Sequence, residues 1–268
     1  MHEFHIVVCM KVVPKAEEIR VDPESLLLDR ENARSEINPP DMNAIEHALR
    51  IKDQCRARVS ILSMGPPLFE SILRVGLAMG ADDFYLLSDR AFAGADTLAT
   101  TYTLARGIDK IGDVDLVICG EESADGATGQ VPAGIAEWLG WPQVTLATEF
   151  QLSDDYTVCT ARREIPGGYE VHRVKLPAVF SVKTASNEPR FMDFDRKPWA
   201  MEEAGVIVWS RSDIEVEDDL IGLKGSPTIV SGLEQAETRA RQQHMLEGDP
   251  ESIAAQLAEI LAPFHTRN

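Results

Sequence analysis

The stretch Cys119-Gly-Glu-Glu-Ser-Ala-Asp-Gly-Ala-Thr-Gly-Gln-Val-Pro132 says most about the fold of this chain. It follows an apolar run at residues 114–118 and precedes an amphipathic run at 133–139, which predicts strand, glycine-rich loop and helix. The first turn of a helix carries free backbone N–H groups and the positive end of the helix dipole. Glycines let the backbone approach an anion, so the stretch is either a nucleotide-phosphate loop or an ordinary surface connection. Thr128 and Gln130 favour a nucleotide loop because they add side-chain hydrogen-bonding groups.

Strand and helix patterns alternate through the first half of the chain. Apolar runs at residues 4–10, 59–62 and 84–87 predict three more buried strands, with amphipathic segments between them. This alternation predicts an α/β fold: a mostly parallel, Rossmann-like sheet with helices on both faces. Ligands bind such sheets at the carboxyl ends of the strands. The loops after Met10, Met64 and Ile118 are therefore expected to face one crevice.

Individual residues mark where the predicted helices begin and end. Asp41 and Asp96 are predicted N-caps, and Gly80 is the predicted end of the second helix. Asp249-Pro250-Glu251 predicts the start of a last helix within an extended C-terminal arm. Its apolar stripe consists of Ile253, Leu257, Ile260 and Leu261.

The pattern changes after Leu146. Strand-like runs at 156–161 and 169–174 flank Pro166-Gly167-Gly168, a hairpin signal, and residues 177–182 predict another strand. These runs predict an antiparallel addition to the sheet. Regular patterning fades between residues 187 and 204.

Composition limits the partners. The chain has 268 residues, 44% of them hydrophobic, with 26 Lys+Arg against 44 Asp+Glu, and its formal net charge is -18. Such a charge repels nucleic acid and anionic membranes at long range, so no nucleic-acid partner is expected. No window reaches eighteen apolar residues, so no transmembrane segment is expected. No signal peptide is recognisable either. The scattered Cys9, Cys55, Cys119 and Cys159 fit a reducing cytoplasm and indicate no metal site.

The sequence offers no catalytic set. It lacks the dinucleotide fingerprint G-x-G-x-x-G, the P-loop, the G-x-S-x-G elbow and H-E-x-x-H. Asp125 is interpreted either as a ribose ligand or as a brace of its own turn. Lys11 is either a phosphate ligand or a plain surface lysine. A nucleotide crevice without catalytic residues is typical of a carrier or binding subunit.

The chain resembles the beta subunit of electron transfer flavoproteins along nearly its whole length. Each matching segment is weak alone, but their ordered set is specific. The segments are Val8-Cys-Met-Lys-Val-Val-Pro14, Ile37-Asn-Pro-Pro-Asp-Met-Asn-Ala-Ile-Glu-His-Ala-Leu49, Ser63-Met-Gly-Pro66, Ala78-Met-Gly-Ala-Asp82, the loop 120–132 with Trp141-Pro-Gln-Val-Thr145, Val174-Lys-Leu-Pro-Ala178, Asn187-Glu-Pro-Arg190 and Gly222-Leu-Lys-Gly-Ser-Pro-Thr228.

The resemblance implies a heterodimer with an alpha subunit. In that family the pair takes electrons from acyl-CoA or other dehydrogenases, or from NADH, and passes them to a membrane-bound quinone-linked or other acceptor. The beta subunit holds AMP in the common type and a second FAD in the electron-bifurcating type. The predicted cofactor-binding residues are Cys9, Lys11, Asn38, Pro39, Pro40, Asp41, Met64, Gly120, Asp125, Gly126, Ala127, Thr128, Gly129, Gln130 and Val131.

The amino-acid sequence of the loop indicates which nucleotide is bound. Asp125-Gly-Ala-Thr-Gly-Gln-Val131 is more similar to the bifurcating or nitrogen-fixation-associated type, which favours FAD, with AMP as the alternative. Ala127, Gly129 and Pro132 depart from that type, in which aspartate, alanine and glycine are often found at these positions.

The resemblance also implies three parts of the chain. Residues 1–186 are the expected nucleotide-binding domain, 187–204 a partner-docking loop, and 205–268 a segment and arm contacting the alpha subunit. The expected docking residues are Asn187, Glu188, Pro189, Arg190 and Phe194. The loop carries Asp193, Asp195, Glu202 and Glu203 where the family has a basic run, which predicts an unusual partner.

Two functions of other classes stay open from the sequence. An adenine-nucleotide-binding regulator of the stress-protein kind would use a similar sheet, bind ATP without flavin and form a homodimer. A nucleotide-processing enzyme, such as an ATP-using ligase, is disfavoured by the missing P-loop and by the lack of clustered acids and bases.

Overall fold

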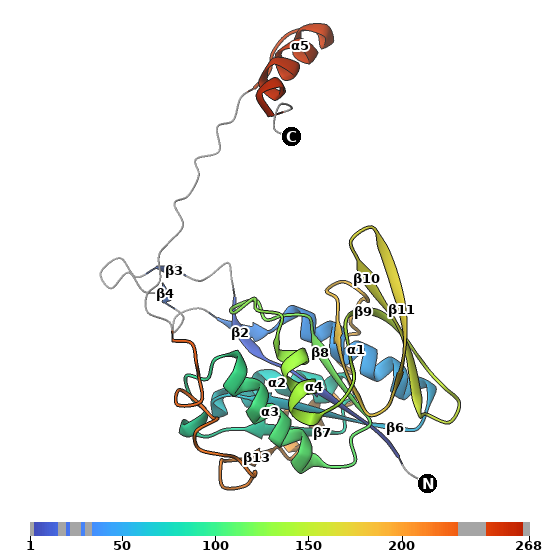
Figure 1. The fold of residues 1–268 in the computed structure, drawn as a ribbon, viewed down its shortest axis with the longest axis vertical. Helices are drawn as coiled ribbons and strands as arrows, with labels where there is room; N and C mark the ends of the chain where they lie inside the picture. The colour runs from blue at the N-terminus through green and yellow to red at the C-terminus, as the bar shows by residue number, and fades with distance from the viewer. Residues whose placement is uncertain (1–2, 16–19, 22–27, 30–33, 230–244, 265–268) are drawn as a thin grey trace. The chain divides into compact units, whose positions relative to one another are not determined.

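The computed structural model describes residues 3–15, 20–21, 28–29, 34–229 and 245–264. The chain divides into two compact units, residues 1–233 and residues 234–268. The first unit contains a nine-stranded sheet in the order β11-β10-β9-β12-β8-β1-β6-β7-β13, within the part that is described (Figure 1). Its strands are β1 (Phe4–Cys9), β6 (Ala57–Met64), β7 (Asp83–Leu87), β8 (Leu116–Gly120), β9 (Gln143–Leu152), β10 (Val158–Ile165), β11 (Gly168–Lys175), β12 (Ala178–Val182) and β13 (Ile207–Trp209).

Helices cover both faces of this sheet, as the sequence predicted. They are α1 (Pro39–Gln54), α2 (Glu70–Met79), α3 (Thr97–Ile111) and α4 (Val131–Leu139). The short strands β2 (Val12–Pro14) and β5 (Ser35–Ile37) pair with each other, as do β3 (Arg20–Val21) and β4 (Leu28–Asp29). Single turns lie at Pro67–Phe69, Arg90–Phe92, Trp199–Glu203 and Ala262–Phe264.

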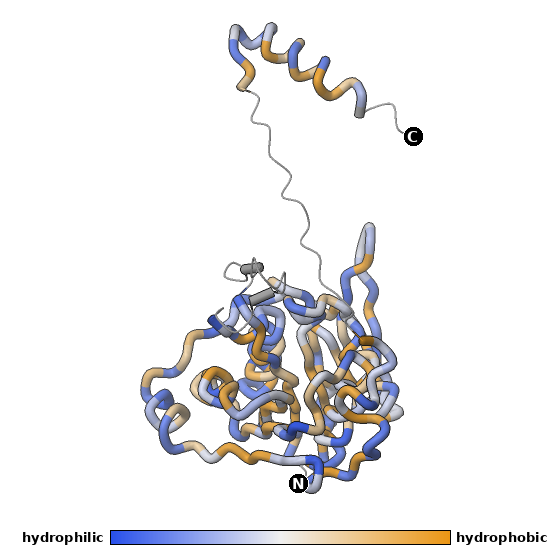
Figure 2. Tube along the Cα trace, turned by 90° about the vertical axis from the view of Figure 1, so that its left-hand side faces the viewer, coloured by the Kyte–Doolittle hydropathy of each residue, from blue (hydrophilic) through white to orange (hydrophobic). Residues whose placement is uncertain are grey.

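Two apolar cores lie on opposite faces of the sheet. Side chains alternate along a strand, so Ile6 and Val8 face the core beneath α1 and α2, while Val7 and Cys9 face the core beneath α3 and α4. The central strands are therefore apolar on both faces, which is typical of parallel sheets. Figure 2 shows apolar colour through the interior of this unit.

The predicted N-cap of α1 is wrong. Asn38, not Asp41, is the N-cap residue, and α1 begins with Pro39 and Pro40. Proline suits the first helical positions because its missing N–H would have no partner in the helix there. Asp41 consequently lies inside the first turn, where it is buried.

The predicted antiparallel hairpin is confirmed, and the strand predicted at residues 177–182 is present as β12, but its antiparallel direction is wrong. β10 pairs antiparallel with both β9 and β11, and the hairpin projects beyond the rest of the sheet at the right of Figure 1. β12 instead lies between β8 and β9 and is parallel to both. It is buried along its whole length, as a central parallel strand should be. β9 was not predicted, because it is half exposed and lacks a continuous apolar run.

Helix α5 (Pro250–Leu261) is the main element of the second unit, and it confirms the predicted last helix. The Asp249 carboxylate accepts a hydrogen bond from Ser252 N (2.9 Å), so it caps the helix. Leu257, Ile260 and Leu261 are each about half exposed. Apolar and polar colours alternate along α5 in Figure 2. No helix in the described ranges is long and apolar enough to cross a bilayer.

Candidate functional site

The three predicted loops leave the same edge of the sheet. β1 lies between β8 and β6 and is parallel to both, with Cys9 beside Cys119 on one side and Leu62 on the other. The carboxyl ends of the three strands therefore stand next to one another. The predicted cofactor-binding residues lie at or just beyond this edge, because they end these strands, follow them or begin α1 and α4.

Asn38 joins the start of α1 to the glycine-rich loop. Its Oδ1 accepts a hydrogen bond from Ala124 N (3.0 Å), and its Nδ2 donates to Glu122 O (2.9 Å) and to Asp41 Oδ1 (3.0 Å). Asn38 is 1% exposed. The first half of the loop is thus held from below by one buried amide.

Asp41 is a buried carboxyl group at the centre of these loops. Its second oxygen accepts a hydrogen bond from Lys11 N (2.7 Å), directly after β1. Burial raises the pKa of Asp41 to about 7, while hydrogen bonds from Lys11, Asn38 and Gly120 act in the opposite direction. Gly120 has to lack a side chain, since a Cβ there would collide with the Asp41 carboxyl and with Pro40.

Lys11 reaches across the edge to the same loop. Its Nζ lies 2.5 Å from Asp125 Oδ1 and 3.4 Å from Ser123 Oγ. The Lys11 side chain is 46% exposed, whereas the Asp125 side chain is 18% exposed. Although Asp125 is partly desolvated, the Lys11 ammonium and the hydrogen bonds to its carboxyl hold its pKa below the usual range. The ion pair therefore presents a solvent-accessible cation beside the loop.

The second half of the loop has a strained but open backbone. Ala127 and Gly129 both have a positive φ, 47° and 62°. The amides of Gly126 and Ala127 donate to Ser123 O, but those of residues 128–131 donate to no residue that the structure describes. Together with Lys11 and the dipole at the start of α4, these N–H groups form a donor set that suits the phosphates of a nucleotide.

Cys9, Cys119 and Met64 lie beneath the loops. Both thiols are free and buried, side by side on β1 and β8. The neighbouring Cys9, together with burial, raises the pKa of Cys119. Met64 ends β6 and packs partly buried against the core under α3 and α4. None of the three is a candidate nucleophile or metal ligand.

Two contacts of the loop had no sequence signal. Thr184 N, just after β12, donates to Glu121 Oε1 (2.7 Å), and Thr97 Oγ1 donates to Thr128 Oγ1 (3.3 Å). Both are made by segments distant in sequence, so only the parallel placement of β12 and the start of α3 could reveal them. Potential metal-binding groups of three or more His, Cys, Asp or Glu are absent from the described part of the chain.

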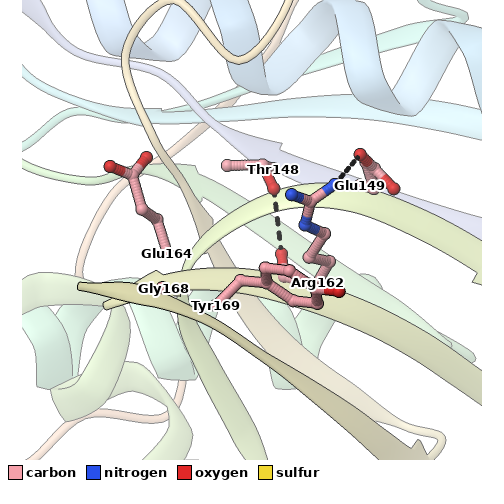
Figure 3. A pocket seen from close by; sticks show the side chains of 6 residues that line it. All are labelled: Thr148, Glu149, Arg162, Glu164, Gly168 and Tyr169. Atoms are coloured by element: carbon pink, nitrogen blue, oxygen red, sulfur yellow. Dashed lines mark hydrogen bonds and ion pairs between the residues drawn. The ribbon is translucent and has the colours of Figure 1, made fainter. Parts of the chain in front are cut away.

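An open pocket of about 440 Å³ lies away from this edge, on the projecting strands β9, β10 and β11 (Figure 3). Its floor is already paired: Arg162 Nη1 contacts Glu149 Oε1 (2.8 Å), and the Arg162 guanidinium stacks on the Tyr169 ring at 4.2 Å. Thr148 Oγ1 donates to Arg162 O (3.3 Å). This pocket presents no unpaired charge to a ligand.

The predicted docking segment is anchored on α1 and α2. Asn187 and Asn43 exchange side-chain-to-backbone hydrogen bonds (2.8 and 2.9 Å). Arg190 pairs with the buried Glu46 (2.8 Å) and with Asp53 (2.7 Å), while Arg196 donates to the carbonyls of Leu77 and Ala81. Between these anchors, Phe191 and Phe194 are 94% and 85% exposed.

The sheet, its helices and this edge define a Rossmann-like α/β protein with an anion-suited loop at the carboxyl ends of its strands. The comparisons specify it further. Residues 25–213 match the electron transfer flavoprotein domain, so the chain belongs to the electron transfer flavoprotein family, and its relatives identify it as the beta subunit.

The matches with these relatives cover most of both chains. The electron transfer flavoprotein subunit beta of Clostridium acetobutylicum is 41% identical over 97% of this chain and 99% of its own. Subunit CarD of the caffeyl-CoA reductase-Etf complex of Acetobacterium woodii is 42% identical over 84% of this chain and 85% of its own. Protein FixA of Azotobacter vinelandii is 38% identical over 96% of this chain and 94% of its own.

Proposed function

We propose that this chain holds an adenine nucleotide at the edge formed by β8, β1 and β6, and that this nucleotide is FAD, with AMP as the alternative. The observation that carries the proposal is the donor set of Lys11 and the four amides at residues 128–131. Lys11 is accessible, and residues 128–131 lead into the first turn of α4. Such a set binds a pyrophosphate or phosphate through main-chain hydrogen bonds.

The sequence of the loop and the relatives of the chain favour FAD over AMP. One relative is a subunit of a caffeyl-CoA reductase-Etf complex, and several are FixA proteins. When bound, FAD exchanges electrons one at a time or two at once as a hydride, so the protein contributes binding, orientation and exclusion of water. This role needs no catalytic acid or base, and the sequence offers no such set of residues.

The proposed function is therefore that of a carrier subunit. In a heterodimer with the alpha subunit it passes electrons from a dehydrogenase, or from NADH, to a quinone-linked or other acceptor, with bifurcation if FAD is held. The apolar stripe of α5 supports an arm that packs on the alpha subunit. Family membership decides against the stress-type regulator and the ligase.

The cofactor can be identified directly. The chain is co-expressed with its alpha subunit, and the purified heterodimer is denatured so that released nucleotides can be measured by absorbance and mass spectrometry. Two flavins per heterodimer are expected, one of them lost when Lys11→Ala is combined with Gly129→Ala. One flavin with one AMP rejects FAD in this subunit, and one flavin with no second nucleotide rejects the site altogether.

We further propose that Phe194 is the anchor for the electron-donating dehydrogenase. Its side chain is exposed on a segment whose backbone is fixed by Arg190 and Arg196, so little ordering is needed on binding. The acidic residues around it, Asp193 and Asp195, indicate a partner surface with positive charge.

Phe194→Ala should lower the rate of electron transfer from the cognate dehydrogenase by at least tenfold, because truncating a hot-spot side chain that the partner buries costs about 2 kcal/mol or more of binding. Stopped-flow reduction of the heterodimer by the reduced dehydrogenase measures this rate. Val171→Ala, which truncates another exposed apolar side chain on β11, is the control and should leave the rate and nucleotide content unchanged. Equal rates for Phe194→Ala and the wild type contradict the docking proposal.

A further inference from the structure

We infer that Asn38 and Asp41 are positioning residues: they hold the first half of the nucleotide loop in shape from beneath and make no contact with the nucleotide. This inference rests on the proposed function, and it divides the predicted site residues into two groups. Asn38 and Asp41 bind the protein itself, whereas Lys11 and the backbone at residues 128–131 face the ligand.

The hydrogen-bonding capacity of Asn38 is already spent on the chain. A side-chain amide has two N–H donors, and both are used, on Glu122 O and Asp41 Oδ1. Its oxygen accepts from Ala124 N. These three bonds also fix which end of the amide is oxygen and which is nitrogen. Because the residue is 1% exposed, no donor remains for a phosphate or a ribose.

Asp41 has to be an acceptor at this position. One oxygen accepts from Asn38 Nδ2 and the other from Lys11 N, and the backbone of Gly120 donates to the same group. The carboxyl thus ties the ends of β1 and β8 to the start of α1. A donor placed here would face three donors and leave buried N–H groups unsatisfied, which costs about 1–3 kcal/mol for each group.

The consequence is a loop with one fixed half and one open half. Residues 122–124 are attached to Asn38 at two backbone positions. Beyond the turn at Ser123–Ala127, the amides of residues 128–131 have no partner among the described residues. Fixing the first half before the ligand arrives means that binding does not have to order it, and affinity rises accordingly.

The decisive experiment exchanges the two side chains. Asp41→Asn alone sets an NH₂ group against the NH₂ group of Asn38 or against Lys11 N. The double variant Asn38→Asp/Asp41→Asn restores the bond between the two side chains, the acceptor for Ala124 N and the acceptor for Lys11 N. The bond to Glu122 O is lost, and the Gly120 amide keeps an acceptor only at the oxygen that also accepts from Lys11 N.

Affinity is measured by calorimetric titration of AMP, and separately of FAD, into heterodimer freed of the nucleotide of this subunit. Asp41→Asn and Asn38→Ala should each weaken binding at least tenfold, and the exchanged double variant should recover most of that loss. Ser60→Ala is the matched control, because it deletes a fully buried hydroxyl that contacts His5 and Asp83 away from the site. It should lower thermal stability without changing the dissociation constant.

Hydrogen exchange on the wild type tests the same inference without any substitution. The Ala124 amide should be protected with or without nucleotide, while the amides of residues 128–131 should gain protection only when it binds. Gain of protection at Ala124 in step with residues 128–131 overturns the inference. So does a single variant that binds as tightly as the wild type, or an exchanged variant no better than Asp41→Asn. A wild type that binds neither AMP nor FAD rejects the proposed site itself.

Discussion

Ala127 has a backbone conformation that is unfavourable for alanine. Its φ is 47°, a left-handed value that costs a residue with a Cβ about 1 kcal/mol, and that glycine, asparagine and aspartate tolerate best. Strain of this kind persists where the surrounding structure fixes the backbone, as Asn38 and Ser123 do here.

Ala127→Gly and Gly129→Ala should therefore act in opposite directions. The first should raise the free energy of unfolding by up to about 1 kcal/mol, and the second should lower it by about 1 kcal/mol or more, because Gly129 also has a positive φ. Urea unfolding of the isolated heterodimer measures both. A stabilising Gly129→Ala would contradict the left-handed geometry.

Residue roles at the site were only partly predictable. The sequence pointed to Asp41, Lys11 and Asp125 as separate candidates. It left Lys11 open between a phosphate ligand and a surface lysine, and Asp125 between a ribose ligand and a brace of its own turn. Their mutual contact could not be foreseen, because Lys11 and Asp125 are brought together only by the pairing of β1 with β8. That pair links the loop to the segment after β1.

At the scale of elements, Asp96 fixes more than its own helix. Its carboxylate accepts hydrogen bonds from Leu98 N and Ala99 N at the start of α3, and from Thr228 N and Oγ1 in a distant segment. The N-cap was predicted from sequence. The second role was not, because nothing in a cap signal indicates a partner 132 residues away.

Asp96→Ala should accordingly cost more than a simple cap. A loss of about 2 kcal/mol or more is expected from the missing cap together with the released segment at Thr228. Differential scanning calorimetry compares it with Asp249→Ala, whose carboxylate caps only α5 by accepting from Ser252 N. Equal effects of the two substitutions would show that the contact with Thr228 contributes nothing.

Strand direction was the part of the fold that sequence patterns left undecided. A continuous apolar run such as β12 shows that both faces are buried, but it does not say which strands lie beside it or how they run. The hairpin β10–β11 was predictable because its turn residues act locally. Hydrophobic periodicity alone predicted the alternating strands and helices of the first half.

For the whole molecule, acid should weaken the fold through His47. Burial, and secondarily the nearby Arg50, lowers the pKa of His47 from 6.5 to about 4 in the folded chain. Between these pH values the unfolded chain binds a proton that the folded chain refuses. Stability is therefore fully present above about pH 6.5 and is lost as the pH falls towards 4.

His47→Gln should remove this contribution, which amounts to about 3 kcal/mol between pH 7 and pH 4. Urea unfolding of the wild type and the variant at several pH values measures the difference. Comparing the two proteins cancels the parts due to His5, whose pKa is also lowered, and to Asp41, whose pKa is raised. Parallel pH profiles for the two would contradict the assignment.

The segment between β12 and β13 has fixed ends and exposed side chains between them. It leaves the middle of the sheet, crosses α1 and α2 through Asn187, Arg190 and Arg196, and re-enters at the far edge as β13. Both ends of this crossover are fastened by backbone pairing, so its outward side chains can vary without disturbing the strands. Under the docking proposal, substitutions in this one short stretch would change the redox partner, and the stretch could be exchanged between homologues as a single segment.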